Sequence, residues 1–180
     1  MGSERTGIRI REASAADEDT LWLMLTFAAS MGNGGAEQVP KAKADPYLGS
    51  YVEKWTQRAG DLGVVALDRY ERSVGAAWLR LNESHGDFTV GTDTVPELAT
   101  GVLPDCRERG VGTLMMSALI RIAQPRFEAI TLSVRETNRA ARFYERFGFR
   151  ETGRLQNRVG GASLILRLDL QSLGPLPSTD

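Results

Sequence analysis

Apolar residues follow two different periods along this chain, and each period predicts one type of element. Short runs that alternate apolar with polar residues, or that are continuously apolar between turn residues, predict strands. Segments of this kind are residues 7–12, 62–67, 74–81, 98–103, 130–134, 150–158 and 162–170. A polar turn at residues 68–73 and the pair Gly160-Gly161 each join two of these segments, which predicts two antiparallel hairpins.

Other segments carry apolar residues at the spacing of one helix face, which predicts helices. They are residues 21–29, 46–59, 111–122 and 140–147. Asn138 is placed to cap the last of these helices, Gly148 to end it, and Phe149 to fold back as the apolar contact of a Schellman cap. Residues 32–46 show no apolar period and predict a mobile loop.

The composition is that of an ordinary globular protein with one domain. The chain has 180 residues, of which 42% are hydrophobic and 25% are charged, and this length suffices for one domain with a sizeable core. We expect residues 1–173 to form that domain and residues 174–180, which contain proline, to form a frayed C-terminal tail.

The net charge and the cysteine content limit which partners and which cellular compartment we expect for this chain. The formal net charge of −1 argues against a nucleic-acid binder that relies on overall positive charge. Cys106 is the only cysteine, so the chain cannot form an intramolecular disulfide, which suits a reducing compartment. No apolar run is long enough to span a bilayer, and the first residues lack a signal-peptide pattern. These features predict a cytoplasmic protein without a membrane or nucleic-acid partner.

Residues 104–113, Pro-Asp-Cys-Arg-Glu-Arg-Gly-Val-Gly-Thr, lie between a predicted strand and a predicted helix. Gly110 and Gly112 let a ligand approach the backbone closely. The first amides of a helix lack intrahelical acceptors and carry the positive end of its dipole, and Arg107 and Arg109 add positive charge. The stretch therefore predicts a pyrophosphate-binding turn, although it has the spacing neither of a Walker loop nor of a dinucleotide fingerprint.

This turn resembles motif A of the GCN5-related N-acetyltransferase (GNAT) family. In that motif, Gln/Arg-x-x-Gly-x-Gly/Ala follows a strand and holds the pyrophosphate of acetyl-CoA, and Arg107, Gly110 and Gly112 match it. Residues 130–149 resemble motif B of the same family, a strand followed by a helix with Asn138, Phe143-Tyr144 and Gly148-Phe149. The two motifs occur in the family's order and together cover residues 96–149.

The resemblance implies an α/β (α+β) fold with a curved, mixed sheet. About seven strands, mostly antiparallel, would carry helices on both faces. Two central parallel strands would splay apart for CoA, the first ending at Leu103 and the second running over residues 130–134.

The resemblance also implies an acetyl-CoA-dependent N-acetyltransferase. The acetyl group would pass directly to a primary amine within a ternary complex, without a metal. Family members often pair through their sheets, which favours a homodimer. The residues that match cosubstrate-binding positions are Gly101, Val102, Leu103, Arg107, Glu108, Arg109, Gly110, Val111, Gly112, Thr113, Asn138 and Tyr144.

Two residues are candidates for the chemistry. Tyr144 matches a tyrosine that protonates the leaving thiolate in many family members, and its phenol holds its proton at neutral pH; the alternative is a core tyrosine beside Phe143. Glu97 opens the first central strand and is the candidate general base; the alternative is a surface acid at a strand edge. Asn138 either caps its helix, contacts CoA, or does both.

Two residues of the turn depart from the family. Cys106 stands where an aromatic residue is common, and a covalent acetyl-cysteine is disfavoured because no base adjoins it in sequence. Glu108 stands where glycine or a basic residue is common, and its carboxylate would repel a pyrophosphate unless it points outward or pairs with Arg107 or Arg109. The lone His85 fits a solvated turn, because no cluster of metal ligands surrounds it in sequence.

The sequence does not identify the acceptor amine, because this fold serves small molecules and protein N-termini alike. Residues 32–46 correspond to a region that borders the acceptor pocket in the family, which favours a lid over a plain connection. Five acids near the proposed acceptor loops either attract a cationic acceptor or are solvated: Asp45, Glu53, Asp61, Asp87 and Asp93. The alternatives from other classes are a non-catalytic acyl-CoA sensor, which would not need Tyr144, and a protein-interaction domain, which would not need Gly110 and Gly112.

Overall fold

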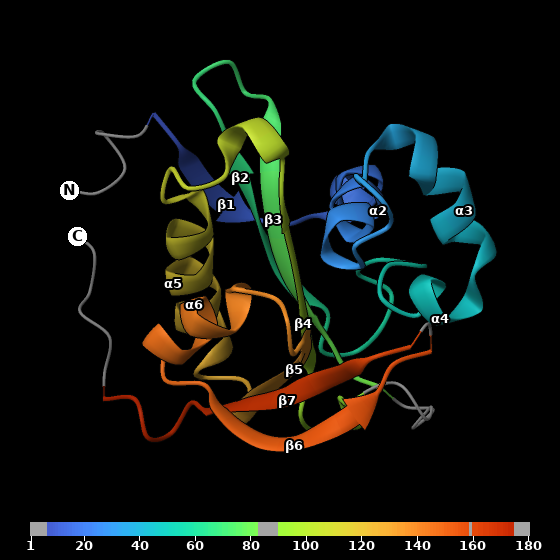
Figure 1. The fold of residues 1–180 in the computed structure, drawn as a ribbon. Coiled ribbons are helices and arrows are strands. Elements are labelled where there is room, and N and C mark those ends of the chain that lie inside the picture. Colours follow the sequence, from blue (N-terminus) through green and yellow to red (C-terminus); the bar gives the residue numbers. More distant parts are fainter. Residues whose placement is uncertain (1–6, 83–89, 159, 175–180) are drawn as a thin grey trace. The chain divides into compact units, whose positions relative to one another are not determined.

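The computed structural model of the protein describes residues 7–82, 90–158 and 160–174 (Figure 1). Its helices are α2 (Glu18–Ala28), α3 (Val39–Ala44), α4 (Pro46–Gly49), α5 (Val111–Ala123) and α6 (Ala140–Arg146). Short 3-10 turns are η1 (Ala15–Asp17), η2 (Ala36–Gln38) and η3 (Pro104–Cys106). The strands are β1 (Arg9–Glu12), β2 (Leu62–Leu67), β3 (Ser73–Arg80), β4 (Glu97–Val102), β5 (Ala129–Arg135), β6 (Arg150–Gln156) and β7 (Ala162–Asp169).

The seven strands form one sheet in the order β1-β2-β3-β4-β5-β7-β6. The pairs β1–β2, β2–β3, β5–β7 and β6–β7 are antiparallel. Strands β4 and β5 are parallel and share a single register pair, Glu97 opposite Thr131, where the Thr131 amide donates to the Pro96 carbonyl at 3.0 Å. The mixed and mostly antiparallel sheet is confirmed, and the short parallel pairing is what splayed central strands predict.

The described residues form two compact units. One contains those of Met1–Leu79 and Ala99–Ile120, and the other those of Arg80–Leu98 and Arg121–Asp180. The first unit therefore holds the end of β4 and the turn before α5, whereas the second holds β5, α6 and the β6–β7 hairpin. The expectation that residues 1–173 act as one domain stays a prediction.

In the first unit, α2 and α5 lie on opposite sides of strands β1 to β3 (Figure 1). Since helices cover both faces, every residue of β2 is buried and the strand is continuously apolar rather than alternating. The α2 side buries one apolar cluster, made of Leu21, Trp22, Met24, Leu25, Ala42, Val52, Trp55, Val65, Leu67, Ala76, Trp78 and Ala99. On the α5 side, Met115 and Leu119 are fully buried.

Strand β4 approaches the backbone of α2 closely at Gly101. A methyl group built on Gly101 would lie 2.3 Å from the carbonyl oxygen of Met24, well inside van der Waals contact. Any larger residue would push α2 away from the strand, so glycine is required here by packing.

In the second unit, β7 pairs with both β5 and β6. Alternation predicts that Leu164, Leu166, Leu168 and Leu170 share a core face; the last three are buried, whereas Leu164 is half-buried. Helix α6 ends in the predicted Schellman cap. The Phe149 amide donates to the Tyr144 carbonyl at 3.3 Å, and the Gly148 amide donates to the Glu145 carbonyl at 3.0 Å. Gly148 has a φ of +96°, which explains the glycine, and Phe149 is buried.

Two expectations about residues 32–60 are wrong. The predicted helix over 46–59 ends as α4 at Gly49, because the Tyr51 carbonyl accepts a hydrogen bond from Trp78 Nε1 at 2.9 Å and Lys54 and Thr56 have positive φ. The predicted loop over 32–46 instead contains η2 and α3, whose Ala42 is fully buried in the core. In both places contacts with distant residues override the local pattern.

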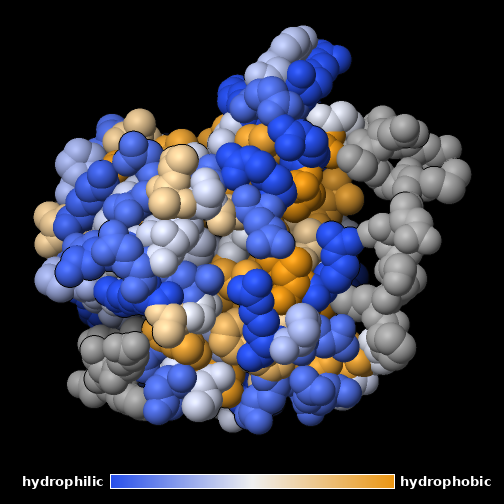
Figure 2. All heavy atoms as spheres, turned by 180° about the vertical axis from the view of Figure 1, so that it is seen from behind, coloured by the Kyte–Doolittle hydropathy of each residue, from blue (hydrophilic) through white to orange (hydrophobic). Residues whose placement is uncertain are grey.

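Large hydrophobic side chains are rarely exposed in the described part of the chain. Hydrophilic side chains cover most of the face seen in Figure 2, with apolar side chains visible between them. Among the described residues, Tyr70 is the one large hydrophobic side chain that is exposed, at 75%. None of the helices in the described part of the chain is long and apolar enough to cross a membrane.

We predict that Gly101→Ala destabilises the protein, because the new methyl group overlaps the Met24 carbonyl. The expected loss in free energy of unfolding is about 1–3 kcal/mol, the range for overpacked sites, measured by urea denaturation. Gly153→Ala is the matched control, since its methyl group would lie at an ordinary 3.6 Å from Ile165 Cδ1, and we expect a change within about 1 kcal/mol. Equal stability of the two variants would contradict the packing argument.

Candidate active site

The predicted phosphate-binding turn connects β4 to α5 within the first unit. After η3, the backbone of Arg107 is extended, and Glu108 and Gly110 adopt positive φ values of +59° and +81°. Helix α5 then begins at Val111. The two left-handed residues reverse the chain direction just before the helix, so residues 107–110 are all exposed.

The start of α5 offers unpaired amides beside this exposed turn. The Leu114 amide donates to the Gly110 carbonyl at 3.1 Å, whereas the amides of Val111, Gly112 and Thr113 precede the first intrahelical bond. These amides carry the positive end of the dipole of a helix of 13 residues. The arrangement suits a bound pyrophosphate.

Glu108 is unfavourable in this turn both for its backbone conformation and for binding of an anion. A left-handed conformation costs a residue with a side chain about 1–2 kcal/mol, a strain that glycine at this position would avoid. Within the described residues, Glu108 forms no ion pair with Arg107 or Arg109. Its charge is therefore not neutralised by either arginine.

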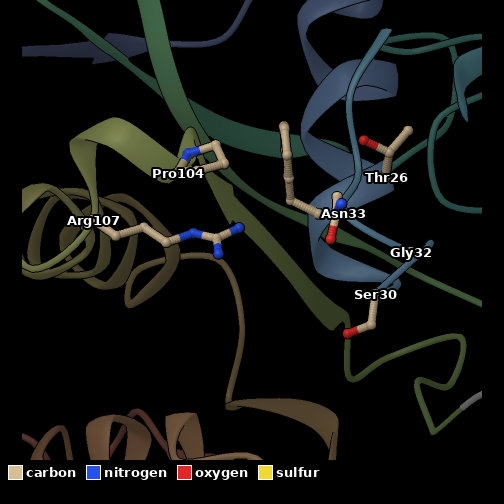
Figure 3. A pocket seen from close by; sticks show the side chains of 7 residues that line it. Thr26, Ser30, Gly32, Asn33, Pro104 and Arg107 are labelled. Atoms are coloured by element: carbon tan, nitrogen blue, oxygen red, sulfur yellow. The ribbon is translucent and has the colours of Figure 1, made fainter. Parts of the chain in front are cut away.

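Arg107 points toward α2. Its Nε donates to the Val102 carbonyl at 3.2 Å, and its guanidinium lies 5.6 Å from the centroid of the Phe27 ring. The two contacts hold the side chain across the gap between the turn and the end of α2 (Figure 3).

A polar pocket of about 340 Å³ lies at this place in the first unit. One wall comes from the end of α2 and the residues after it, and the other from the turn (Figure 3). The lining residues are Thr26, Phe27, Ser30, Gly32, Asn33, Pro104 and Arg107. Among the described residues that line it, Arg107 alone is charged, so the pocket favours neutral polar or negatively charged groups.

The sequence did not single out Ser30 and Asn33 of this pocket. Ser30 follows the predicted helix over 21–29 and Asn33 lies in the predicted loop over 32–46, but nothing local indicates that either residue faces the turn at Pro104. Their place in the pocket depends on the packing of α2 against β4.

The end of β4 is held by its neighbours in the first unit. The Leu103 amide donates to the Val74 carbonyl at 2.9 Å, and the Val102 carbonyl accepts from Arg107 as described. Gly101 is buried, while Val102 and Leu103 are half-buried. The strand end is thus fixed in place, and the two half-buried residues keep some surface for a ligand.

Cys106 lies in the turn but is buried at 8% exposure. Burial raises the pKa of the Cys106 thiol, and the neighbouring Asp105 carboxylate raises it further. A thiol that holds its proton is a poor nucleophile, which disfavours a covalent acetyl-cysteine.

Tyr144 lies on α6 in the second unit, buried at 8% exposure. Its ring forms edge-to-face contacts with Phe143 and Phe149, with centroids 5.4 and 5.7 Å apart. Burial raises the pKa of the Tyr144 phenol well above its ordinary value of about 10. No other described residue forms a hydrogen bond with the hydroxyl, so this donor is available to a ligand.

Glu97 is also buried, at 5% exposure, which rules out a solvated surface acid. Its Oε2 accepts from the amides of Val90 and Gly91, at 3.1 and 3.4 Å. The carboxylate therefore fixes the segment that precedes β4, whatever further part it has in the chemistry. Asn138 precedes Arg139, the N-cap residue of α6, so it is not itself the cap. Its Oδ1 accepts from the amide of Ala140, the first residue of the helix, at 2.9 Å, and its side-chain NH₂ forms no hydrogen bond with a described residue.

Two of the five acids near the proposed acceptor loops accept hydrogen bonds from nearby backbone amides. Asp45 Oδ1 accepts from the Tyr47 amide, and Asp61 Oδ2 accepts from the Thr56 amide, each at 2.9 Å. Glu53 and Asp93 are exposed. His85 and Asp87 lie outside the described residues. In the ranges that are described, no group of three or more His, Cys, Asp or Glu side chains could hold a metal ion.

Several solved structures of acetyltransferases have the same fold as this chain. A GCN5-related N-acetyltransferase from Kribbella flavida is 20% identical, with a TM-score of 0.64, over 92% of this chain and 99% of that one. The ribosomal-protein-S18-alanine N-acetyltransferase from Escherichia coli is 17% identical, with a TM-score of 0.63, over 96% and 99%. An acetyltransferase from Salmonella typhimurium, solved with its cofactor acetyl-CoA, is 19% identical, with a TM-score of 0.60, over 91% and 94%.

Comparison of sequences with curated proteins found no match. The family model described as Acetyltransferase (GNAT) domain matches residues 59–151, which include β4, the turn, α5, β5 and α6. The match covers more than half of the chain and contains both motifs. The chain therefore belongs to the GNAT acetyltransferase family.

Proposed function

We propose that this protein is an acetyl-CoA-dependent N-acetyltransferase that acts on a primary amine by direct transfer in a ternary complex. Membership of an acetyltransferase family supports the reaction class. The observation that carries the mechanism is the buried phenol of Tyr144, which keeps its proton and has no partner among the described residues.

The turn at residues 107–113 would bind the pyrophosphate of acetyl-CoA. The amides of Val111, Gly112 and Thr113 would donate to its oxygens, and Arg109 would add a charge at the exposed rim. Gly101, Val102 and Leu103 would place the pantetheine arm along the end of β4. The side-chain NH₂ of Asn138 is a further donor that we assign to acetyl-CoA.

Acetyl-CoA supplies an activated thioester. A neutral amine nitrogen forms the new C–N bond while the C–S bond breaks, and the electron pair of that bond passes to sulfur. Because burial disfavours the Tyr144 phenolate, this side chain stabilises the developing thiolate by donating a hydrogen bond rather than by losing its proton completely. The proton that the amine loses ends on the sulfur, so the products are the amide and CoA.

Glu97 is the proposed general base, either directly or through water. Its burial and its two amide donors hold the carboxylate in one place, which suits a base but equally suits a purely structural role. An acceptor whose amine has a lowered pKa would need little help from it.

The acceptor is a small amine or a protein N-terminus. One structural relative is the ribosomal-protein-S18-alanine N-acetyltransferase, whose name fits a protein acceptor. Its sequence identity of 17% to this chain supports a shared fold and not a shared acceptor. We infer a cytoplasmic location from the lone, reduced cysteine, and a homodimer from the habit of the family. The alternative function is a non-catalytic acyl-CoA sensor, for which the Tyr144 hydroxyl would have no purpose.

Acetyl-CoA should bind saturably to the purified chain, and the double variant Arg109→Glu/Gly112→Asp should bind at least about tenfold more weakly. The two new carboxylates would face the pyrophosphate, and each lost charge-assisted bond is worth about 1.5–3 kcal/mol. Isothermal titration calorimetry gives the dissociation constants. Glu108→Gln is the matched control. It removes a carboxylate from the same turn, so it should change the affinity in the opposite direction and tighten binding. If the intact, folded chain binds no acetyl-CoA, the proposed function is wrong.

Tyr144→Phe should lower kcat by about 10²–10⁴-fold while leaving the affinity for acetyl-CoA unchanged, because the hydroxyl acts on sulfur only as the C–S bond breaks. Turnover is followed by release of free CoA with an amine panel. Phe143→Leu, on the neighbouring ring, controls for loss of packing and should have a small effect. An acyl-CoA sensor would release no CoA with any amine, and its ligand affinity would not depend on the hydroxyl.

The pH dependence of stability should report the burial of Tyr144, which is one of four tyrosines in the chain. Since the folded-state pKa of Tyr144 is raised, the unfolded chain holds fewer protons above about pH 10, so stability should fall as pH rises beyond that value. In Tyr144→Phe this alkaline loss should be smaller; an identical pH dependence in both proteins would show that the phenol is not desolvated.

A further inference from the structure

The polar pocket of the first unit contains an arginine whose side chain is held in place. Arg107 is exposed, as several arginines of this chain are, but two contacts fix its guanidinium, namely the bond from Nε to the Val102 carbonyl and the Phe27 ring. Within the described residues, no hydrogen bond occupies the terminal Nη1 and Nη2 groups. Both groups can therefore donate side by side to one ligand.

The second wall of the pocket belongs to residues 30–35, and their contacts with α2 fix its shape. The hydroxyl of Thr26, a fully buried residue, accepts a hydrogen bond from the Gly35 amide at 2.9 Å. Gly34 lies directly against the Phe27 ring, since a methyl group built on this glycine would lie 2.3 Å from Cδ1 of the ring. The wall is thus formed before any ligand binds.

Two polar side chains of this wall, Ser30 and Asn33, line the pocket together with Arg107 (Figure 3). Neither side chain forms a hydrogen bond or an ion pair with another described residue. A hydroxyl and a primary amide can each donate a hydrogen bond to an oxygen atom of a ligand. Among the described residues that line it, the pocket thus combines one fixed positive charge with two neutral donors and no acid.

We infer that this pocket binds a carboxylate of the acceptor, so that the substrate is a small molecule that carries both an amine and a carboxylate; the inference rests on the proposed function. The two free Nη groups of Arg107 match the two oxygens of a carboxylate. One guanidinium balances the single charge of a carboxylate, whereas a phosphate monoester carries about −1.5 to −2 at pH 7. A volume of about 340 Å³ suits a small amino acid better than a peptide chain.

The position of the pocket agrees with an acceptor group rather than with the pyrophosphate. Arg107 contacts the Val102 carbonyl at the end of β4, along which we placed the pantetheine arm of acetyl-CoA. A carboxylate held by Arg107 would keep the amine of the same small molecule near this strand end. The amides at the start of α5 and Arg109 are assigned to the pyrophosphate, which does not require the Arg107 side chain. All of these residues belong to the first unit.

The test compares acceptors that differ only in the carboxylate. Release of CoA from acetyl-CoA by the full chain is measured with α-, β- and γ-amino acids, each beside its carboxamide. For the amino acids that are acetylated, kcat/KM should exceed that of the carboxamide about tenfold, because only the carboxylate forms charge-assisted bonds with Arg107. In Arg107→Gln this ratio should fall to near one, and the loss should appear in the KM of the amino acid, since the bonds exist before and during the reaction.

Two further variants keep the test specific. Ser30→Gly/Asn33→Ala removes both neutral donors, and the ratio should be intermediate; glycine fits residue 30, whose φ is +53°. Arg69→Gln removes an exposed arginine of the first unit that does not line the pocket, and the ratio should stay near ten. The ratio within one pair of acceptors is the readout because a change in acetyl-CoA binding affects both members equally. Thermal midpoints check that each variant is folded.

The possible outcomes separate this inference from the proposed function. Carboxamides acetylated as well as the amino acids, or binding of acetyl-CoA without acetylation of any amino acid, would overturn the inference and leave the proposed function standing. If Arg107→Gln slows both members of a pair equally, its side chain serves acetyl-CoA and the inference is wrong. If the intact, folded chain binds no acetyl-CoA, the proposed function fails and the inference fails with it.

Discussion

The close approach of α2 to β4 at Gly101 is the constraint on which the candidate site of the first unit depends. With no side chain at this residue, the carbonyl of Met24 lies directly against the strand, so the end of α2 and the end of β4 meet. Arg107, which follows that strand end, can then reach the Val102 carbonyl and the Phe27 ring at once. The polar pocket and the orientation of the turn both follow from this contact between one helix and one strand.

Burial acts on three polar side chains with different results. The phenol of Tyr144 and the thiol of Cys106 keep their protons, because an apolar environment disfavours the charged form. A buried carboxylate needs donors instead, and Glu97 obtains them from the amides of Val90 and Gly91. Desolvation thus makes Tyr144 a hydrogen-bond donor and Cys106 an unreactive residue, and it ties Glu97 to the backbone before β4.

Positive charge is distributed unevenly in this chain. The formal net charge is −1, yet the amides at the start of α5 and the neighbouring Arg109 form a positively polarised region. In the second unit, Arg154 pairs with Glu136 and Arg167 pairs with Glu128. The overall charge therefore argued against binding driven by bulk electrostatics but carried no information about the local charge at the start of α5.

Elements that depend on local pattern could be predicted from the sequence by itself. Periodicity and the backbone preferences of neighbouring residues predict the strands, α5 and the turn before it. They also predict α6 and its Schellman cap at Gly148. The predictions for residues 32–60 were wrong because the Trp78 indole donates a hydrogen bond to the Tyr51 carbonyl and because Ala42 is buried in the core. Both contacts join parts of the chain that are distant in sequence. For the same reason, only the tertiary structure decided that Glu97 is buried and that Ser30 and Asn33 face Arg107. Burial and pocket walls depend on which distant segments pack together, and local spacing does not encode that.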